Sequence, residues 1–146
     1  MQTALLILHL IGGSIWAGGH LVLAIGFLPP ALRRRDPSII QGFEARFEPI
    51  GLTALGLQVI TGVLLLAPHV EGFGSESPLG GHLVGVIGAK FVLLLATIGL
   101  AAHARLRLIP RLKPETLGFL GAHIIAVTVL AVLFIVVGVA FPDAGG

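Results

Sequence analysis

The sequence has no cysteine, and Met1 is its one methionine. Without cysteine, it can form neither a disulfide framework nor a thiolate site. Charge is also scarce: 11% of the 146 residues are charged, against about 25% in a typical soluble domain. With a mean hydropathy of +1.03, the chain has too few charged side chains to cover a water-soluble core. The net charge of only +2 gives no basis for binding nucleic acid. This composition excludes a soluble enzyme, a disordered chain and a nucleic-acid-binding protein.

Long apolar stretches are present instead. A transmembrane helix needs about 20 mainly apolar residues. Four such stretches occur, at about 3–28, 50–67, 79–103 and 116–141. We expect Pro29-Pro30 to end the first and Pro68 the second. The apolar–polar alternation of barrel strands is missing. The sequence therefore predicts an all-α membrane protein, a four-transmembrane-helix bundle that forms a single domain over residues 1–146.

The basic residues indicate how these helices are oriented. Eight of the nine lie in the first and third connections: Arg33, Arg34, Arg35, Arg46, Arg105, Arg107, Arg111 and Lys113. The second connection and the C-terminal tail contain none. By the positive-inside rule, the first and third connections are cytoplasmic and both termini lie outside. We expect a multi-pass protein of the cytoplasmic membrane of a prokaryote, with anionic lipid at its basic loops.

Six histidines are the informative polar residues. They are His9, His20, His69, His82, His103 and His123. Ionisable groups at membrane depth are functional candidates, although an imidazole can also simply bridge two helices. At 100° per residue, His9, Trp16 and His20 share one face of the first span with Gly12 and Gly13. That face should point into the bundle, where small residues make room for a neighbouring helix or a flat cofactor.

By depth, the histidines fall into two groups. His9, His69 and His82 are expected near the outer surface. His20, His103 and His123 are expected near the inner surface. Imidazoles from different helices are the usual axial ligands of haem b. The leading hypothesis is therefore a redox protein with one or two haems b. It pairs His20 with His123 or His103 inside, and His9 with His82 or His69 outside.

Lys90 is the remaining basic residue and lies inside the third span. It could pair with a haem propionate or bind an anionic quinone species. The alternative is that its ammonium group reaches towards the outer interface.

Copper is the alternative cofactor, bound by the same six histidines. Imidazole suits copper, but Cu(I) pathways usually use cysteine or methionine. The absence of sulfur ligands argues against a Cu(I) conduit built wholly from this chain. A histidine-only Cu(II) or Zn(II) site stays open, above all outside, where Glu71 and Glu76 neighbour His69. In a third reading the chain is a structural subunit whose histidines only join helices.

Several motifs resemble a known family. Residues 9–19, with His9, Trp16 and Gly18-Gly19, resemble the first helix of the copper-resistance D (CopD) family. Further similar segments are Arg46-Phe47-Glu-Pro-Ile, Leu57-Gln-Val-Ile-Thr61-Gly62, Lys90-Phe-Val-Leu-Leu-Leu and Arg105-Leu-Arg107. This resemblance implies copper handling at the cytoplasmic membrane. Lys90 followed by His103 is similar to the arrangement in HemJ-type protoporphyrinogen oxidases, which bind haem b.

No nucleophile–base pair is evident in the sequence. If the protein is an enzyme, it should be a haem-dependent membrane oxidoreductase. Partners consistent with this hypothesis are the lipid bilayer and a quinone, quinol or porphyrin. A second copy of the chain or a larger membrane complex is also consistent with it. Trp16, Lys90 and the histidines other than His69 are the expected cofactor-binding residues.

Overall fold

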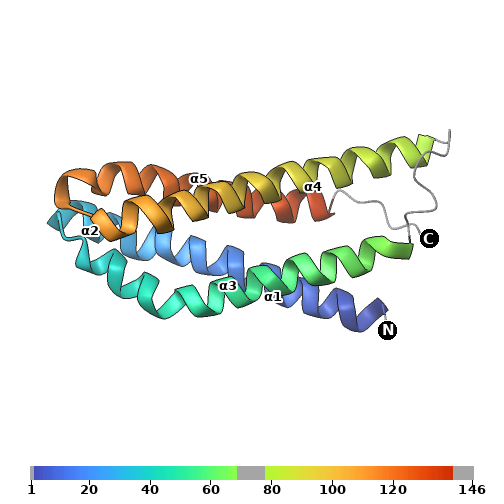
Figure 1. The fold of residues 1–146 in the computed structure, drawn as a ribbon, viewed down its shortest axis with the longest axis horizontal. Helices are drawn as coiled ribbons and strands as arrows, with labels where there is room; N and C mark the ends of the chain where they lie inside the picture. The colour runs from blue at the N-terminus through green and yellow to red at the C-terminus, as the bar shows by residue number, and fades with distance from the viewer. Residues whose placement is uncertain (1, 69–77, 140–146) are drawn as a thin grey trace.

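The protein is an elongated bundle of four long helical segments (Figure 1). The computed structural model describes the backbone of residues 2–68 and 78–139, and the side chains of 2–68 and 84–139. All regular structure within these ranges is helical. Each of the four segments is long and apolar enough to cross a membrane, which confirms the all-α membrane fold.

The chain forms its helices in a simple up-and-down order. The elements are α1 (Gln2–Val22), a π-helical turn η1 (Leu23–Phe27), α2 (Leu28–Arg34), α3 (Ser38–Leu66), α4 (Pro78–His103), a second π-helical turn η3 (Ala104–Leu108), two 3-10 turns η4 (Ile109–Arg111) and η5 (Pro114–Thr116), and α5 (Leu117–Val139). The third and fourth spans match the predicted ranges closely, within the described residues.

The first span is longer than predicted, because Pro29-Pro30 do not end it. The helical path continues to Arg34 through η1 and α2. Both prolines lie in the first turn of α2, where an N–H would have no intrahelical partner. The π-helical turn before them shifts the hydrogen-bonding pattern, so the proline rings are accommodated. The path ends at Arg35, which adopts a left-handed conformation with φ 53°.

The second span also begins earlier than predicted, at Ser38 instead of about Ile50. Hydropathy detected only its apolar part, whereas the helix includes the charged stretch around Arg46 and passes through Pro49. Asp36 accepts hydrogen bonds from the backbone N–H and the hydroxyl of Ser38, at 2.9 and 2.6 Å. These bonds help to start α3, and they hold the pKa of the Asp36 carboxyl below its ordinary value.

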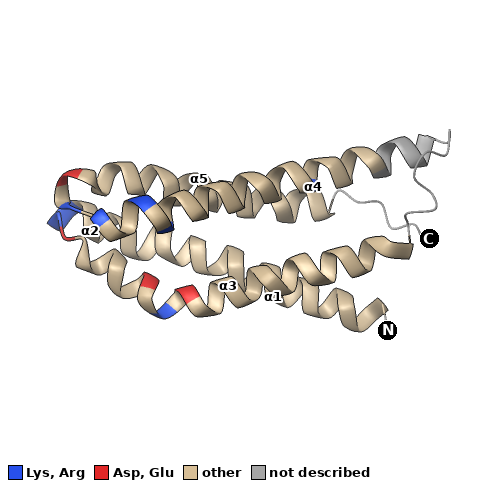
Figure 2. Ribbon diagram, viewed as in Figure 1, with Lys and Arg blue, Asp and Glu red and all other residues tan. Residues whose placement is uncertain are grey.

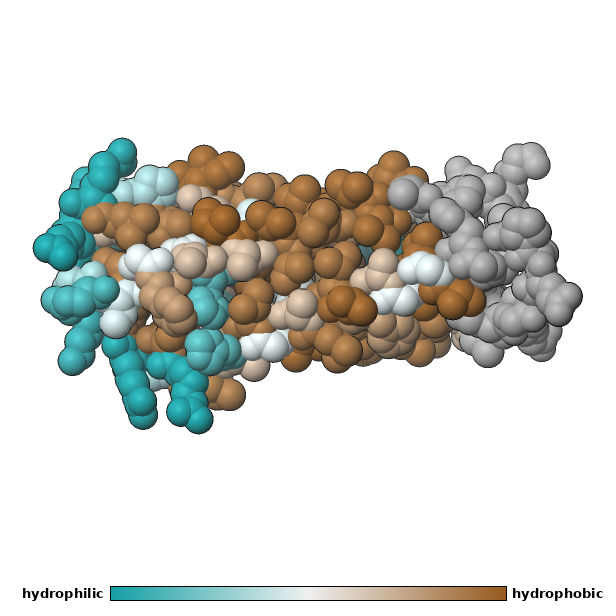
Figure 3. Space-filling model, turned by 90° about the horizontal axis from the view of Figure 1, so that it is seen from above, coloured by the Kyte–Doolittle hydropathy of each residue, from teal (hydrophilic) through white to brown (hydrophobic). Residues whose placement is uncertain are grey.

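Charge is concentrated at one end of the bundle, which we call the basic end. It contains Arg33, Arg34, Arg35, Arg107, Arg111 and Lys113 (Figure 2). Apolar side chains cover most of the remaining described surface on the face shown in Figure 3. Helix α1 begins and α5 finishes at the opposite end (Figure 1). Both connections predicted to be cytoplasmic therefore meet at one end.

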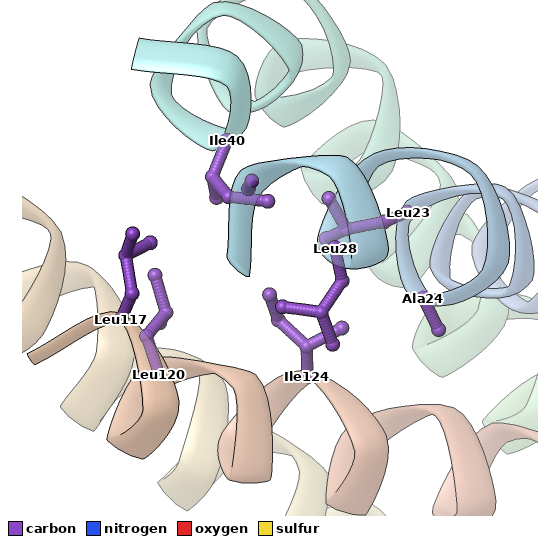
Figure 4. Packing of buried hydrophobic residues seen from close by; sticks show 8 residues of the cluster. Leu23, Ala24, Leu28, Ile40, Leu117, Leu120 and Ile124 are labelled. Carbon is purple, nitrogen blue, oxygen red and sulfur yellow. The ribbon is translucent and has the colours of Figure 1, made fainter. Parts of the chain in front are cut away.

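Helix α1 is central to the packing. It lies along α3 on one side and α5 on the other, and α4 packs on α5. Near the basic end, Leu23 and Leu28 from the first span meet Ile40 of α3 and Leu117 and Ile124 of α5 (Figure 4). This cluster of buried aliphatic side chains fixes three of the four spans relative to one another, and so positions the polar residues next to it.

Candidate functional site

His20 lies on α1 with one ring nitrogen fixed. Its Nδ1 is 2.9 Å from the carbonyl oxygen of Trp16, one turn earlier. Because a carbonyl can only accept, Nδ1 carries the proton, and Nε2 of the neutral ring keeps its lone pair. The ring also packs on the Trp16 indole, with centroids 4.4 Å apart, and meets Phe47 of α3 edge-on at 6.0 Å. One hydrogen bond and two aromatic contacts thus orient the His20 ring.

His103 and His123 form a second imidazole arrangement, between α4 and α5. Nδ1 of His123 lies 3.2 Å from the carbonyl oxygen of Phe119, so it is the protonated nitrogen of that ring. Nε2 of His123 lies 3.0 Å from Nδ1 of His103. In the neutral pair His103 must therefore donate and His123 must accept, which leaves the lone pair of His103 on Nε2. The structure brings these two inner histidines into direct contact.

A cavity of about 110 Å³ lies beside both arrangements. We call it the His20–His123 cavity, because both rings line it together with residues from all four spans. Water needs roughly 10–15 Å³ on this measure, so the cavity can hold several waters or a hydrated ion. Trp16 forms part of its wall, and the buried indole N–H of Trp16 has no acceptor among the described residues. Of the three histidines expected near the inner surface, His20 and His123 line this cavity. His103 does not line it, but it contacts His123.

Three charged residues also line this cavity, and sequence reasoning missed them as site residues. Glu44 and Glu48 lie one turn apart on α3, and Arg105 reaches in from η3. Nη2 of Arg105 lies 2.6 Å from Oε2 of Glu48. The i, i+4 spacing of the two carboxylates was a usable signal. This spacing was not interpreted as a site, because residues 38–49 were expected to be a connection outside the span.

His9 makes a different kind of contact. Its Nδ1 lies 2.8 Å from Oγ1 of Thr61, and the Thr61 hydroxyl donates to the Leu57 carbonyl at 2.6 Å. His9 and Thr61 are therefore hydrogen-bonded across the α1–α3 interface. With its amide oriented to match donors and acceptors, Gln58 lies against the same turn of α1. It donates to the His9 carbonyl at 2.9 Å and accepts from Gly13 N–H at 3.2 Å. These contacts join α1 to α3.

The glycines of the first span make room for side chains of α3. A Cβ on Gly19 would overlap the Phe47 ring, and a Cβ on Gly13 would overlap the Gln58 amide. Of the two occupants considered for this face, a neighbouring helix and a flat cofactor, the structure shows the helix. The space beside these glycines is filled by the side chains of Phe47 and Gln58.

The expectation of haem b is not supported. Organic ligands usually occupy pockets of about 300–1,000 Å³, well above the volume of the His20–His123 cavity, about 110 Å³. His103 and His123 touch each other, so a macrocycle does not fit between them. Imidazole nitrogens are a donor type that binds copper and zinc well.

The other predicted residues are placed as follows. His69 lies outside the described residues, and His82 is described only as backbone in α4. The expected outer group of His9, His69 and His82 is therefore not assembled within the described part of the chain. Lys90 is half-buried on α4, within electrostatic range of His9. Among described residues, no group of three or more histidine or acidic side chains is close enough to hold a metal ion.

Together these features define a multi-pass membrane protein with a cavity towards its basic end, lined by two histidines and three charged residues among mainly apolar side chains. The family model described as Copper resistance protein D matches residues 41–141. The chain belongs to this family, which confirms the resemblance seen in the motifs. No curated protein and no solved structure matches the chain. Nothing among these findings supports the HemJ likeness.

Proposed function

We propose that this protein binds copper within the membrane and passes it between the bilayer interior and the cytoplasm. His20 and His123 are the principal ligands in this proposal, and His103 is the neighbour that exchanges with the metal. Membership of the copper-resistance D family supports copper as the cargo. The two histidines lining one cavity support the location.

The observation that carries the proposal is the state of the two Nδ1 atoms. His20 and His123 each donate Nδ1–H to a backbone carbonyl one turn earlier in their helices. Metal-binding histidines almost always donate their other N–H in this way, which fixes the tautomer and raises ligand basicity. The tautomer of each ring is therefore set before any metal arrives, with the lone pair on Nε2.

His103 gives this site a means of opening. In the metal-free arrangement, Nδ1–H of His103 occupies the lone pair of His123. Copper binding at His123 must displace that donor, and rotation of the exposed His103 ring is enough to do so. His103 then presents a lone pair of its own. Imidazoles bind copper in either oxidation state, so the absence of sulfur ligands does not prevent binding here.

The direction of transfer follows from the distribution of charge. In this proposal the basic end faces the cytoplasm and both termini face outwards, in keeping with the positive-inside rule. The outer histidines His9, His69 and His82 would meet copper first, and this earlier prediction stays part of the proposal. The inner site would then release copper close to the cytoplasmic surface.

Metal analysis of the purified full chain tests the proposal. The protein is loaded separately with Cu(I), Cu(II) and Zn(II) in detergent, and bound metal is measured after desalting. We expect retained copper in the unaltered chain, strong loss in His20→Ala and His123→Ala, and a weaker loss in His103→Ala. We expect this order because the Nδ1–H bonds of His20 and His123 hold their rings in place, whereas the His103 ring must rotate before it can bind metal.

Thr61→Val is the matched control, because it removes the hydroxyl bonded to His9 at the α1–α3 interface and leaves every imidazole in place. It should loosen α1 from α3 but retain copper at the inner site. Equal copper content in the unaltered chain and the His20→Ala, His123→Ala double variant would overturn the proposed ligands. A stoichiometric haem with a Soret band would overturn the proposed cargo.

A further inference from the structure

A shallow groove lies between α1 and α3, on the other face of α3 from the His20–His123 cavity. Its volume is about 370 Å³, within the range of about 300–1,000 Å³ that is usual for ligand pockets. The lining residues are Ile15, Pro49, Ile50, Thr53, Ala54 and Leu57. Thr53 is the one polar residue among them, and its hydroxyl donates to the Pro49 carbonyl at 2.7 Å. The groove therefore suits an apolar ligand.

Arg46 continues the α3 wall of this groove towards the basic end. At 100° per residue, Arg46, Ile50 and Leu57 lie within about 40° of one another around the helix. Arg46 is exposed, and its Nη1 donates to the carbonyl of Gly42, a further turn towards the basic end, at 3.4 Å. Among the described residues, no carboxylate lies within ion-pair distance of Arg46. The apolar groove thus ends beside a guanidinium that pairs with no acid in the described part of the chain.

The length of α3 places Arg46 at the edge of the hydrocarbon core. The helix has 29 residues, which is about 43 Å at 1.5 Å per residue. The core of a bilayer is only about 30 Å thick and takes about 20 residues. Because the apolar part of α3 is its C-terminal part, the core spans about residues 47–66. Arg46 then lies at the level of the lipid phosphates, and the groove lies in the adjoining leaflet.

We propose that the α1–α3 groove binds one acyl chain of an anionic phospholipid, whose phosphate pairs with Arg46. A guanidinium can bind phosphate through two parallel N–H···O bonds. Basic side chains at the ends of membrane spans also attract anionic lipids. The groove supplies the apolar contact and Arg46 the charge, so the site recognises both parts of the lipid. It is separate from the His20–His123 cavity and does not depend on copper binding.

A second copy of the chain fits this groove less well. Copies in one membrane share an orientation, so a two-fold axis perpendicular to the bilayer would set the same patch of each copy face to face. The two Arg46 guanidinium groups would then lie at the same depth and repel each other. The carboxylates of α3, Glu44 and Glu48, line the cavity on the other face and do not relieve this repulsion. An anionic lipid brings the opposite charge with it.

Native mass spectrometry of the purified full chain tests this inference by counting bound lipids. The protein is titrated in detergent with phosphatidylglycerol, which is anionic, and with phosphatidylcholine of the same acyl chains, which has no net charge. We expect one phosphatidylglycerol to bind more tightly than phosphatidylcholine. Arg46→Gln should weaken phosphatidylglycerol binding about fivefold, the typical effect of one basic side chain on anionic lipid, and leave phosphatidylcholine binding unchanged. Thr53→Phe should weaken the binding of both lipids, because the new ring fills the groove.

Arg33→Gln is the matched control, because it removes an exposed guanidinium from α2 at the same end of the bundle. It should bind phosphatidylglycerol as the unaltered chain does, and so should Thr53→Val. Circular dichroism of Thr53→Phe should show unchanged helicity. Equal affinity of the unaltered chain for the two lipids would overturn this inference. Undiminished phosphatidylglycerol binding in Arg46→Gln, or in helical Thr53→Phe, would also overturn it. A dimer of the unaltered chain that Thr53→Phe dissociates would assign the groove to a second copy instead.

Discussion

His103 of α4 donates a hydrogen bond from Nδ1 to Nε2 of His123 on α5, at 3.0 Å. This bond joins two spans at the edge of the cavity that His20 also lines. It also settles which nitrogens of the neutral pair carry a proton, because the Phe119 carbonyl accepts from Nδ1 of His123. The contact between α4 and α5 therefore also sets the tautomers of two histidines that we propose take part in copper binding.

The first prediction concerns the protonated nitrogens of these rings. In the metal-free protein near pH 8, His20 and His123 should both be Nδ1–H tautomers. The reason is that a backbone carbonyl accepts from each Nδ1. Nitrogen NMR of protein labelled at histidine measures this directly. On addition of Cu(I), the Nε2 signals of both rings should shift and the Nδ1–H signals should remain. An Nε2–H tautomer at either residue would contradict the ligand assignment.

A second prediction tests the close approach of α3 to α1. Gly19→Ala should destabilise the protein by about 1–3 kcal/mol, a typical cost of overpacking, because the new Cβ overlaps the Phe47 ring. Thermal unfolding in detergent gives the difference. Gly18→Ala is the control on the neighbouring residue, where nothing lies within 4 Å of the new Cβ. Equal stability of the two variants would show that Phe47 does not occupy this place.

A third prediction separates helix joining from metal binding. Thr61→Val removes the hydroxyl that is hydrogen-bonded to His9 and should cost about 0.6 kcal/mol, the average for such interhelical bonds. Thr53→Val, on an exposed face of the same helix, removes only a bond to the Pro49 carbonyl. Unfolding of the two variants in detergent should differ, while copper content at the inner site stays the same in both. Loss of copper in Thr61→Val would place the metal at His9 instead.

The fourth prediction is the orientation in the membrane. Because the chain has no cysteine, single substitutions give unambiguous labelling sites. In intact cells, a membrane-impermeant thiol reagent should label Gln2→Cys and leave Gln41→Cys unlabelled until the membrane is permeabilised. Gln41 is exposed near the start of α3, at the basic end. The reverse pattern would invert the proposed direction of copper transfer.

The sequence was sufficient for the spans because transmembrane helices depend on local properties. Length and hydropathy predicted four helices, and the third and fourth matched within a few residues. The exceptions are instructive. Pro29-Pro30 were expected to end the first span, but a π-helical turn accommodates them. The charged start of α3 was expected to be a connection, because hydropathy does not detect a helix that extends beyond the membrane core.

The histidine groups illustrate the limit of residue periodicity. Periodicity placed His9 and His20 on one face of α1, and depth grouped His20 with His103 and His123. It could not distinguish a histidine that bonds to Thr61 of another helix, as His9 does, from one that bonds to a carbonyl of its own helix, as His20 does. That difference depends on which residue of another helix faces each ring.

The sequence by itself determined that this is a four-span membrane protein with its charge concentrated in two connections. It also determined that the chain has no cysteine and six histidines. Only the tertiary structure decided that Phe47 and Gln58 fill the space left by the glycines. It likewise placed Glu44, Glu48 and Arg105 beside His20 and His123. The physical reason is that spans form from local hydropathy, whereas a site forms from contacts between helices distant in the sequence, which depend on how side chains interlock.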